Sequence, residues 1–563
     1  MVSEATTSHR SERRLLLVIL GIGAPLALMH AFVPIQEFIH RSDDAFYYFG
    51  VAANYPRTGF WTFDGIHATN GVQPLWAMIL SALAQGLAWF GVEDRAVLAR
   101  VFVGLTASLH VASAALLFRL LARTVGRDVA AAAAGAMLFS MGLVWGRVWG
   151  MENSLYATLL FGTALYIHAR WPGGPLTTTA LVTGLLLGLT TLTRLNAGFL
   201  IPCVLLYGLV AQPERAFRER LRFVTLVGAA ATALVGPYLL WNLATTDHLL
   251  PVSGAAKAIG TAHALSERGI DSRLSREFLS MLFWQWRMSI QWLLTSRTLD
   301  GLWIVGGRLF HDGGTMYLPS VAALGACLLA PAALGRPREW MQFLVERGRR
   351  LAPLWYLALF GVVNSAVSVF TYPFQSRAMM RWWFVDSETL PIVLAATLAA
   401  SVVVYVGRRL VPPAHAPRVA VVALAALALW HAQESIRFYW DGTKPERDWN
   451  RSWNEESYAA AQWIQTNLPA DALVGSWNAG VVGYYAGRPV VNLDGLINGF
   501  DFLPYSAEGR VADYIREQGI RYLSDMNSIF EATGVRRSLP LTELYRHHST
   551  KMNEAYLVYR VDP

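Results

Sequence analysis

Cysteine and charge are both scarce in this sequence. Cys203 and Cys327 are the only two cysteines in 563 residues, and each lies within an apolar run. The chain therefore carries neither a disulfide framework nor a cysteine metal site. Charged residues make up 15% of the chain and hydrophobic residues 54%, a balance that excludes an ordinary soluble protein and indicates one embedded in a membrane.

Several recognition motifs are also missing. The glycine pairs Gly306-Gly307 and Gly313-Gly314 follow no phosphate-loop pattern, and no dinucleotide fingerprint occurs, which disfavours a cytoplasmic site for a nucleotide-linked substrate. His248 has no second histidine at a metal-ligand spacing, so a zinc site is not expected. The net charge of +8 comes from arginines clustered in short connections, which indicates membrane topology and not nucleic acid binding.

Apolar runs of about 20 residues, long enough to cross a bilayer as helices, recur along residues 1 to 438. The first run follows several arginines, as in a signal peptide, but it lacks a small-residue cleavage site and is predicted to be retained. The pattern predicts a polytopic α-helical membrane protein with eleven crossings, at 15 to 34, 97 to 121, 129 to 150, 154 to 170, 176 to 193, 195 to 211, 223 to 244, 316 to 335, 353 to 371, 388 to 406 and 418 to 436.

Basic residues set the predicted orientation. Five connections are rich in arginine and are expected on the cytoplasmic side, namely the N-terminus and the stretches 119 to 127, 215 to 222, 336 to 350 and 408 to 418. This arrangement requires one apolar run not to cross. The weakest run is 74 to 92, which we interpret as a helix in the outer interface, unless a later pair of spans is miscounted. The C-terminus is then outside.

The composition changes near Trp440 to mixed polar sequence. The chain is therefore divided into a transmembrane module at 1 to 438 and an extracytoplasmic soluble domain at 439 to 563. The second part is predicted to alternate helices at 455 to 467 and 508 to 518 with strands at 472 to 476, 489 to 493 and 520 to 524. Such alternation predicts a small α/β layer.

Polar residues interrupt the apolar pattern at the predicted outer ends of the crossings. A charge within hydrocarbon costs on the order of 3 kcal/mol, so these exceptions carry information. Separate passages of the chain deliver them to one side of the membrane, which predicts a shared outward-facing cavity. The residues are Asp43 and Asp44, Arg147 and Glu152, Arg194 and Asn196, Asp247, His248 and Lys257, and Arg377, Arg381 and Asp386.

The acidic pair Asp43 and Asp44, followed by the aromatic stretch 46 to 49, suits proton transfer. Burial and a like-charged neighbour can raise the proton affinity of a carboxylate, and aromatic faces bind sugar rings. Such a pair can deprotonate a hydroxyl nucleophile or hold a divalent cation. It can also be a helix cap, since Ser42 and Asp43 are favoured N-cap residues.

The basic candidates have simple interpretations as well. Arg377 and Arg381, beside two tryptophans, can bind a phosphate or can snorkel within an aromatic belt. Lys257 stands alone in what is predicted to be a long outer loop, where solvation is the simple expectation. Arg147 and Glu152 can pair with each other.

Several strings along most of the chain carry a family resemblance: SDDAF at 42 to 46, TNGVQPLW at 69 to 76, WGMENSLYATLL at 149 to 160, LTRLNAGFLIP at 192 to 202, LLPVSGAAKA at 249 to 258 and AGVVGYYAGRPVVNLDGL at 479 to 496. With them the chain resembles the GT-C superfamily of membrane glycosyltransferases. The nearest likeness is to bacterial polyprenyl-phosphate-sugar enzymes such as cell-wall arabinofuranosyltransferases. Members place an interfacial helix after the first external loop, which agrees with our interpretation of 74 to 92.

The resemblance implies that a sugar moves from a polyprenyl-phosphate donor to an acceptor hydroxyl, with inversion, at the outer face of the cytoplasmic membrane. The implied partners are that lipid-linked donor, a glycan, lipid or protein acceptor, and membrane lipids. Asp44 is the expected base, with Asp43 beside it. The remaining roles fall to Arg381, Arg377, Lys257 and Arg194 for the donor phosphate and to Glu152, His248, Tyr47, Asn70 and Gln73 for the acceptor or sugar.

The resemblance also leaves points open. Family members often place an acidic residue or proline after Thr193-Arg194, whereas Leu195-Asn196 stands here, so this passage can set donor specificity differently. Acidic pairs serve metal-dependent and metal-free members alike, so a divalent cation is an open cofactor. The alternative function is a lipid or glycan transporter or flippase. That function predicts ionisable residues deep within helices and an internal repeat, and the sequence indicates neither.

Overall fold

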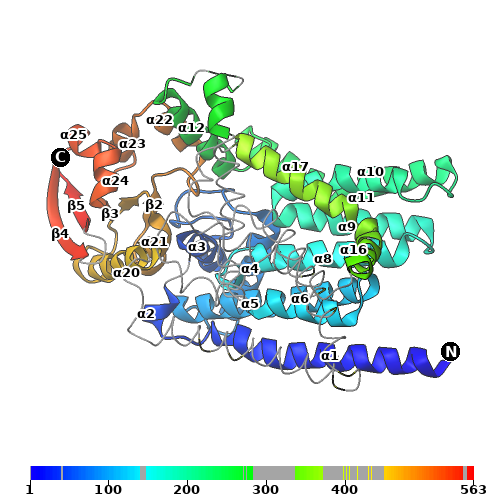
Figure 1. Cartoon of the computed structure of the whole chain (residues 1–563). Helices are drawn as coiled ribbons and strands as arrows, with labels where there is room; N and C mark the ends of the chain where they lie inside the picture. Colours follow the sequence, from blue (N-terminus) through cyan, green and yellow to red (C-terminus); the bar gives the residue numbers. More distant parts are fainter. Residues whose placement is uncertain are drawn as a thin grey trace.

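The computed structural model describes most of the chain. The described residues are 2–39, 42–139, 147–270, 272–273, 275–282, 337–371, 449–549 and 554–563, with a few single residues between 397 and 433. They form a bundle of long helices with a small sheet domain at one end (Figure 1). The N-terminus and the C-terminus lie at opposite ends of the molecule.

The helical module contains both long helices and short connecting ones. Its helices are α1 (Val2–Met29), α2 (Ile35–Phe38), α3 (Asp43–Thr58), α4 (Pro74–Ala88), α5 (Arg95–Thr124), α6 (Arg127–Phe139), α8 (Asn153–Arg170), α9 (Leu176–Thr193), η1 (Leu195–Phe199), α10 (Leu200–Val210), α11 (Phe217–Thr246), α12 (Val252–Ser266), α16 (Pro337–Leu351), η3 (Ala352–Leu354) and α17 (Trp355–Thr371).

Small residues allow the long helices to approach closely. On α9, a Cβ at Gly184 would overlap the backbone oxygen of Val227 on α11, and a Cβ at Gly188 would press against Leu234 at 3.0 Å. Close backbone approach through small residues is the usual way in which helices associate where water does not drive their packing. The glycines of α9 therefore fix the helix pair that leads into the candidate site.

Five described helices are long and apolar enough to cross a membrane, namely Arg13–Ala31, Arg95–Thr124, Leu176–Thr193, Phe217–Thr246 and Arg338–Ser368. A multi-span helical membrane protein is thus confirmed, but the described residues contain only five clear spans, fewer than the eleven crossings predicted. The predicted ranges 316 to 335, 388 to 406 and 418 to 436 lie outside the described residues, apart from a few single positions. The helical stretch Leu195–Val210 is shorter than the ~20 residues that a span needs, and the predicted range 129 to 150 is described only in part.

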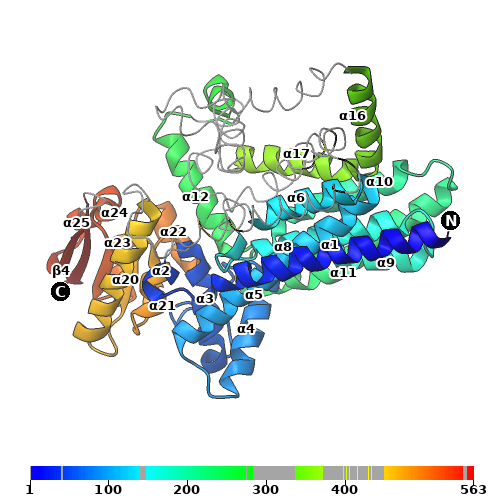
Figure 2. The same ribbon diagram turned by 60° about the horizontal axis from the view of Figure 1, so that its bottom comes forward.

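Helix α4 supports the prediction that residues 74 to 92 do not cross. It has 15 residues, which at about 1.5 Å per residue is too short for a hydrocarbon core of about 30 Å. It also runs across the direction of α1 and α5 rather than along it (Figure 2). Trp89 and Phe90, directly after its end, are 79% and 84% exposed, as expected for side chains that rest in an interface.

The C-terminal domain is a five-stranded sheet covered by short helices. Its elements are α20 (Trp449–Asn467), β1 (Val474–Ser476), α21 (Ala479–Tyr485), β2 (Val490–Asn492), η5 (Phe500–Phe502), α22 (Leu503–Ala507), α23 (Val511–Glu517), β3 (Tyr522–Met526), α24 (Asn527–Ala532), α25 (Val535–Ser538), β4 (Leu541–Ser549) and β5 (Glu554–Val561).

The strand order of this sheet is β2-β1-β3-β5-β4. Strands β2, β1 and β3 are parallel. Together with the helices α20 and α23, they confirm the alternation of helices and strands predicted from the sequence. The antiparallel pair β4 and β5 was not predicted. Its first strand is polar and carries a register shift between Glu543 and Tyr545, which breaks the alternation that marks a strand.

The sheet domain docks on the helical module through α21. Arg95, at the start of α5, donates hydrogen bonds from Nη1 to the backbone oxygens of Gly483 and Tyr484, at 3.2 and 2.6 Å. These carbonyls belong to the last turn of α21, where a helix carries partial negative charge. The contact fixes the sheet domain at the end of the bundle opposite α16 and the N-terminus (Figures 1 and 2).

Candidate functional site

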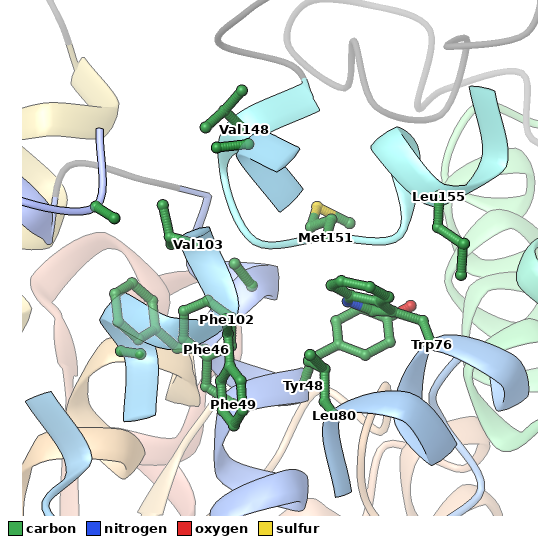
Figure 3. Close-up of a cluster of buried hydrophobic side chains, with 14 of the residues drawn as sticks. Phe46, Tyr48, Phe49, Trp76, Leu80, Phe102, Val103, Val148, Met151 and Leu155 are labelled. Atoms are coloured by element: carbon green, nitrogen blue, oxygen red, sulfur yellow. The ribbon is translucent and has the colours of Figure 1, made fainter. Parts of the chain in front are cut away.

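The aromatic stretch of α3 anchors the candidate site in a buried cluster. Phe46 and Phe49 are fully buried, and the Phe49 ring packs on Phe102 of α5 with centroids 5.3 Å apart. Trp76 of α4 donates from its indole nitrogen to the backbone oxygen of Gly150, at 3.0 Å. Figure 3 shows these rings gathered beneath the loop that leads to α8. The cluster fixes the start of α3, and with it the acidic pair, against that loop.

Asp43 binds the start of a helix in the other domain. Helix α3 begins at Asp43, and Ser42 at its N-cap makes no side-chain capping bond. The Asp43 carboxylate instead accepts hydrogen bonds from the backbone nitrogens of Gly480 and Val481, at 3.0 and 2.8 Å. The capping alternative for Asp43 is therefore wrong, because its side chain is turned towards α21.

The surroundings of Asp43 favour its protonated form. Burial raises the pKa of Asp43 to about 7, and the nearby charges of Asp44 and Asp525 add to this, while the two backbone hydrogen bonds oppose it. Asp525 of β3 accepts hydrogen bonds from the backbone nitrogens of Trp477 and Asn478, at 3.0 and 2.9 Å, and so shapes the loop before α21. Its own pKa is raised to about 6, mainly by burial.

A third carboxylate, Asp494, reaches the same place from the turn after β2. Its Oδ2 lies 3.5 Å from the hydroxyl of Tyr47, and its Oδ1 accepts from the backbone nitrogen of Leu496 at 2.7 Å. Burial raises the pKa of Asp494 to about 7, and the charges of Asp44 and Asp43 add to this. The surrounding NLDGL string contributes to the family resemblance, but no local pattern in the sequence predicts a role for Asp494.

Glu152 and Arg194 form a buried ion pair between α8 and α9. Glu152 Oε1 lies 3.3 Å from Arg194 Nη1, which also donates to Asn153 Oδ1 at 2.7 Å. Glu152 is 2% exposed and Arg194 7%, so the pair is withdrawn from water. Burial raises the pKa of Glu152, and Arg194 opposes that effect. The ion-pair partner that the structure gives Glu152 is therefore Arg194, from the next helix.

Lys257 joins the acidic and basic groups. It lies on α12 and is half-buried, so the expectation of a solvated residue in a long loop is wrong. Burial lowers the pKa of Lys257 to about 8, while the charges of Asp44, Glu152 and Asp494 raise it and that of Arg194 lowers it further. The Lys257 ammonium is thus within electrostatic range of carboxylates from three separate parts of the chain.

Two polar residues of the first loop brace this arrangement. Asn70 donates to Asn242 Oδ1 of α11 at 3.1 Å and accepts from the backbone nitrogen of Val252 at 2.9 Å, which fixes the start of α12. Gln73 accepts through Oε1 from the backbone nitrogen of Leu195 at 3.1 Å. These two side chains, which the resemblance assigned to the sugar or acceptor, thus hold the start of α12, which carries Lys257, and the backbone beside Arg194.

The remaining candidates are an exposed histidine and three residues outside the described part of the chain. His248 is exposed and stacks on Phe500, with ring centroids 4.2 Å apart. Arg377, Arg381 and Asp386 lie outside the described residues. Within the described ranges, no three His, Cys, Asp or Glu side chains are grouped so that they could hold a metal ion.

The comparisons with known proteins concern the fold and the C-terminal domain. Residues 447–559 match a domain of unknown function, DUF8728. No curated protein matches the chain in sequence.

Two solved structures of the oligosaccharyltransferase of the archaeon Archaeoglobus fulgidus align with 96% of this chain and 74% of theirs, both at 14% identity and with TM-scores of 0.50 and 0.51. One of them, called AglB, is in complex with an inhibitory peptide and a dolichol-phosphate, and the other is tethered to an acceptor peptide. ArnT of Cupriavidus metallidurans bound to undecaprenyl phosphate aligns over 96% of this chain and 97% of its own, at 13% identity and a TM-score of 0.44. The chain thus shares the fold of the archaeal oligosaccharyltransferase.

Proposed function

We propose that this protein is a GT-C type glycosyltransferase that moves a sugar from a polyprenyl-phosphate donor to an acceptor hydroxyl. One observation carries the proposal: the Lys257 ammonium of α12 lies within electrostatic range of the Asp44 carboxylate at the start of α3 and of the buried pair of Glu152 and Arg194. A base beside fixed positive charge is what the transfer of a sugar from a lipid phosphate requires. The shared fold with an archaeal oligosaccharyltransferase, one structure of which holds a dolichol-phosphate, supports the donor class.

In the proposed reaction, Asp44 accepts the proton of the acceptor hydroxyl as its oxygen attacks the anomeric carbon. The bond between that carbon and the donor phosphate oxygen breaks, and the lipid phosphate leaves with the bonding electron pair. Lys257 and Arg194, joined by Arg377 and Arg381, offset the negative charge that develops on the departing phosphate, an electrostatic effect that is usually large in catalysis. A single displacement inverts the configuration at the anomeric carbon.

The proposed location is the cytoplasmic membrane, with the site and the C-terminal domain at its outer face. Both lie at one end of the bundle, while α16, which carries Arg349 and Arg350 in its last turn, and the N-terminus lie at the other (Figure 2). Basic segments are retained on the cytoplasmic side, which supports this orientation. We propose residues 1 to 438 as the catalytic membrane module, 439 to 563 as the external domain, and a glycan, lipid or protein as the acceptor.

The first test replaces the proposed base, with Asp44→Asn in the full-length protein. We expect sugar transfer to fall by about 10²- to 10⁴-fold, because the acceptor hydroxyl loses its proton acceptor. Thermal unfolding should stay close to that of the unchanged protein, and polyprenyl phosphate should bind at least as tightly, because a negative charge near Lys257 is removed. The lipid that purifies with the protein, identified by mass spectrometry, provides the donor for the assay.

Asp471→Asn is the matched control, because Asp471 is exposed in the C-terminal domain and undergoes the same chemical change. It should transfer sugar as the unchanged protein does. Full transfer by the Asp44→Asn protein would remove Asp44 as the base. Absence of any lipid-linked sugar or of transfer by the unchanged protein would count against the function itself.

A further inference from the structure

The turn after β2 carries a charged residue into the candidate site. Asp494 is followed by Gly495, whose φ of +81° is a left-handed conformation that other residues adopt only with strain. The turn brings the Asp494 side chain back towards α3, where it meets the Tyr47 hydroxyl. The local sequence therefore aims a carboxylate of the C-terminal domain at the helical module.

This turn is tightly packed on two sides of the site. A Cβ on Gly71 of the first loop would overlap the backbone oxygen of Leu496. On the other side, a Cβ on Gly495 would lie 3.3 Å from that of Ala256, the residue before Lys257 on α12. The turn is thus wedged between the first loop and α12.

The charge of Asp494 acts on the groups of the proposed reaction. Asp494 attracts the Lys257 ammonium, and Asp43 and Asp44 repel the Asp494 carboxylate. The site therefore holds three aspartates, of which two come from α3 and one from the C-terminal domain. Tyr47, between the two domains, also accepts a hydrogen bond from Asn492 at 3.3 Å.

A purely local role does not account for an aspartate at this position. The turn uses one oxygen, Oδ1, as the acceptor for the backbone nitrogen of Leu496. Asparagine forms the same turn through its carbonyl oxygen, and it does so without the cost of withdrawing a charge from water. A carboxylate here is expected where its charge is used.

We propose that Asp494 is a positioning residue of the sugar-transfer reaction, which holds Lys257 and Tyr47 in place so that the C-terminal domain forms one wall of the active site. This inference rests on the proposed function. Before the donor binds, the carboxylates of Asp44, Glu152 and Asp494 all attract Lys257. When the lipid phosphate arrives, it competes with these carboxylates for the Lys257 ammonium. Asp494 then keeps the lysine side chain directed at the phosphate.

The test compares Asp494→Asn with the control Asp471→Asn in the full-length protein. Asparagine keeps the turn but removes a negative charge near the phosphate site, so undecaprenyl phosphate in detergent micelles should bind about three- to tenfold more tightly. Turnover should fall about tenfold or more, because Lys257 is less well placed. General damage to the fold would lower both lipid binding and turnover. Tighter binding together with slower turnover therefore identifies a positioning role. The Asp471→Asn protein should match the unchanged protein in both measurements.

Weaker or unchanged undecaprenyl phosphate binding in the Asp494→Asn protein would overturn the inference, as would unchanged turnover. Should that variant not fold, carbodiimide coupling to carboxyl groups of the unchanged protein provides the answer by peptide mass spectrometry. Undecaprenyl phosphate should change the coupling rate at Asp494 and not at Asp471, and an unaffected Asp494 would count against the role. If the unchanged protein neither binds this lipid nor transfers sugar, the proposed function fails; if it does both and Asp494→Asn behaves identically, only the inference fails.

Discussion

The acidic and basic sides of the candidate site are built differently. On the acidic side, Asp43 and Asp494 lie at the junction of two domains and accept hydrogen bonds from backbone nitrogens. On the basic side, Arg194 is held by the side chains of Glu152 and Asn153, all within the helical module. The acidic side therefore depends on how the domains dock, whereas the basic side depends on a buried ion pair. Substitutions should separate these two dependences.

The largest expected effect is on the basic side, for Arg194→Met. This change leaves Glu152 buried without its cation, which costs about 3–5 kcal/mol of stability. Thermal unfolding in detergent should show a large loss. Adding Glu152→Gln should restore part of it, because a neutral side chain tolerates burial. Arg537→Met, at an exposed arginine of the C-terminal domain, is the control and should unfold like the unchanged protein. An equally small effect of both single changes would mean that the ion pair contributes nothing.

A smaller effect is expected at the junction, for Gly480→Ala. A Cβ at this position would overlap the Asp43 backbone oxygen and carboxylate, so α21 must move away from α3, at a cost of about 1–3 kcal/mol. Hydrogen exchange should rise in α21 and at the start of α3, while α9 and α11 stay protected.

Gly260→Ala is the matched control for that change, since α12 leaves open space around this glycine. Alanine should be neutral or slightly favourable there, because it is the better helix former. Unchanged exchange in the Gly480→Ala protein would show that the contact between α21 and α3 is not tight.

The smallest expected effect is a change in pH dependence, for Asp43→Asn. The folded state raises the pKa of Asp43 from 3.8 to about 7, so it binds this proton more tightly than the unfolded state. The stability from that proton is present at low pH and is lost as the pH rises through about 7. Between about pH 5.5 and about pH 8.5, the melting temperature should therefore decrease less steeply with rising pH for Asp43→Asn than for the unchanged protein.

Some slope should remain in that variant, because the pKa values of Asp494 and Asp525 are raised to about 7 and about 6 and both groups titrate nearby. Asp471→Asn should follow the unchanged protein across the whole range. Parallel curves for Asp43→Asn and the unchanged protein would mean that Asp43 does not titrate in this window.

Local sequence patterns predicted the elements of the site better than their partners. The acidic pair at the start of a helix and the charges at the ends of α8 and α9 followed from the break in apolar pattern. Lys257 was placed in a loop, although Pro251 at the N-cap position of α12 is a helix start signal. The contact of Asp494 with Tyr47 spans 447 residues of sequence, and no local pattern encodes such a pairing.

The number of crossings and the sheet edge were harder to predict for physical reasons. Hydropathy marks apolar runs without giving the length of each helix, so the shorter stretch Leu195–Val210 was counted as a full span. For α4, the distribution of arginines predicted better than hydropathy that the helix does not cross, because it indicates which side of the membrane each connection occupies. The polar strand β4 shows little alternation, and its pairing with β5 comes from the fold as a whole.

The two contacts that hold α21 affect the order in which the protein assembles. Asp43 of α3 binds the first turn of this helix, and Arg95 of α5 binds the last. The helix can therefore pack in place only when α3 and α5 have assembled. Synthesis proceeds from the N-terminus, and the residues that bind Asp43 follow it by more than 400 positions, with a separation of 437 for Gly480. The helices α3 and α5 must therefore be folded before the C-terminal domain can dock. A chain whose synthesis stops before this domain would lack the Asp494 turn.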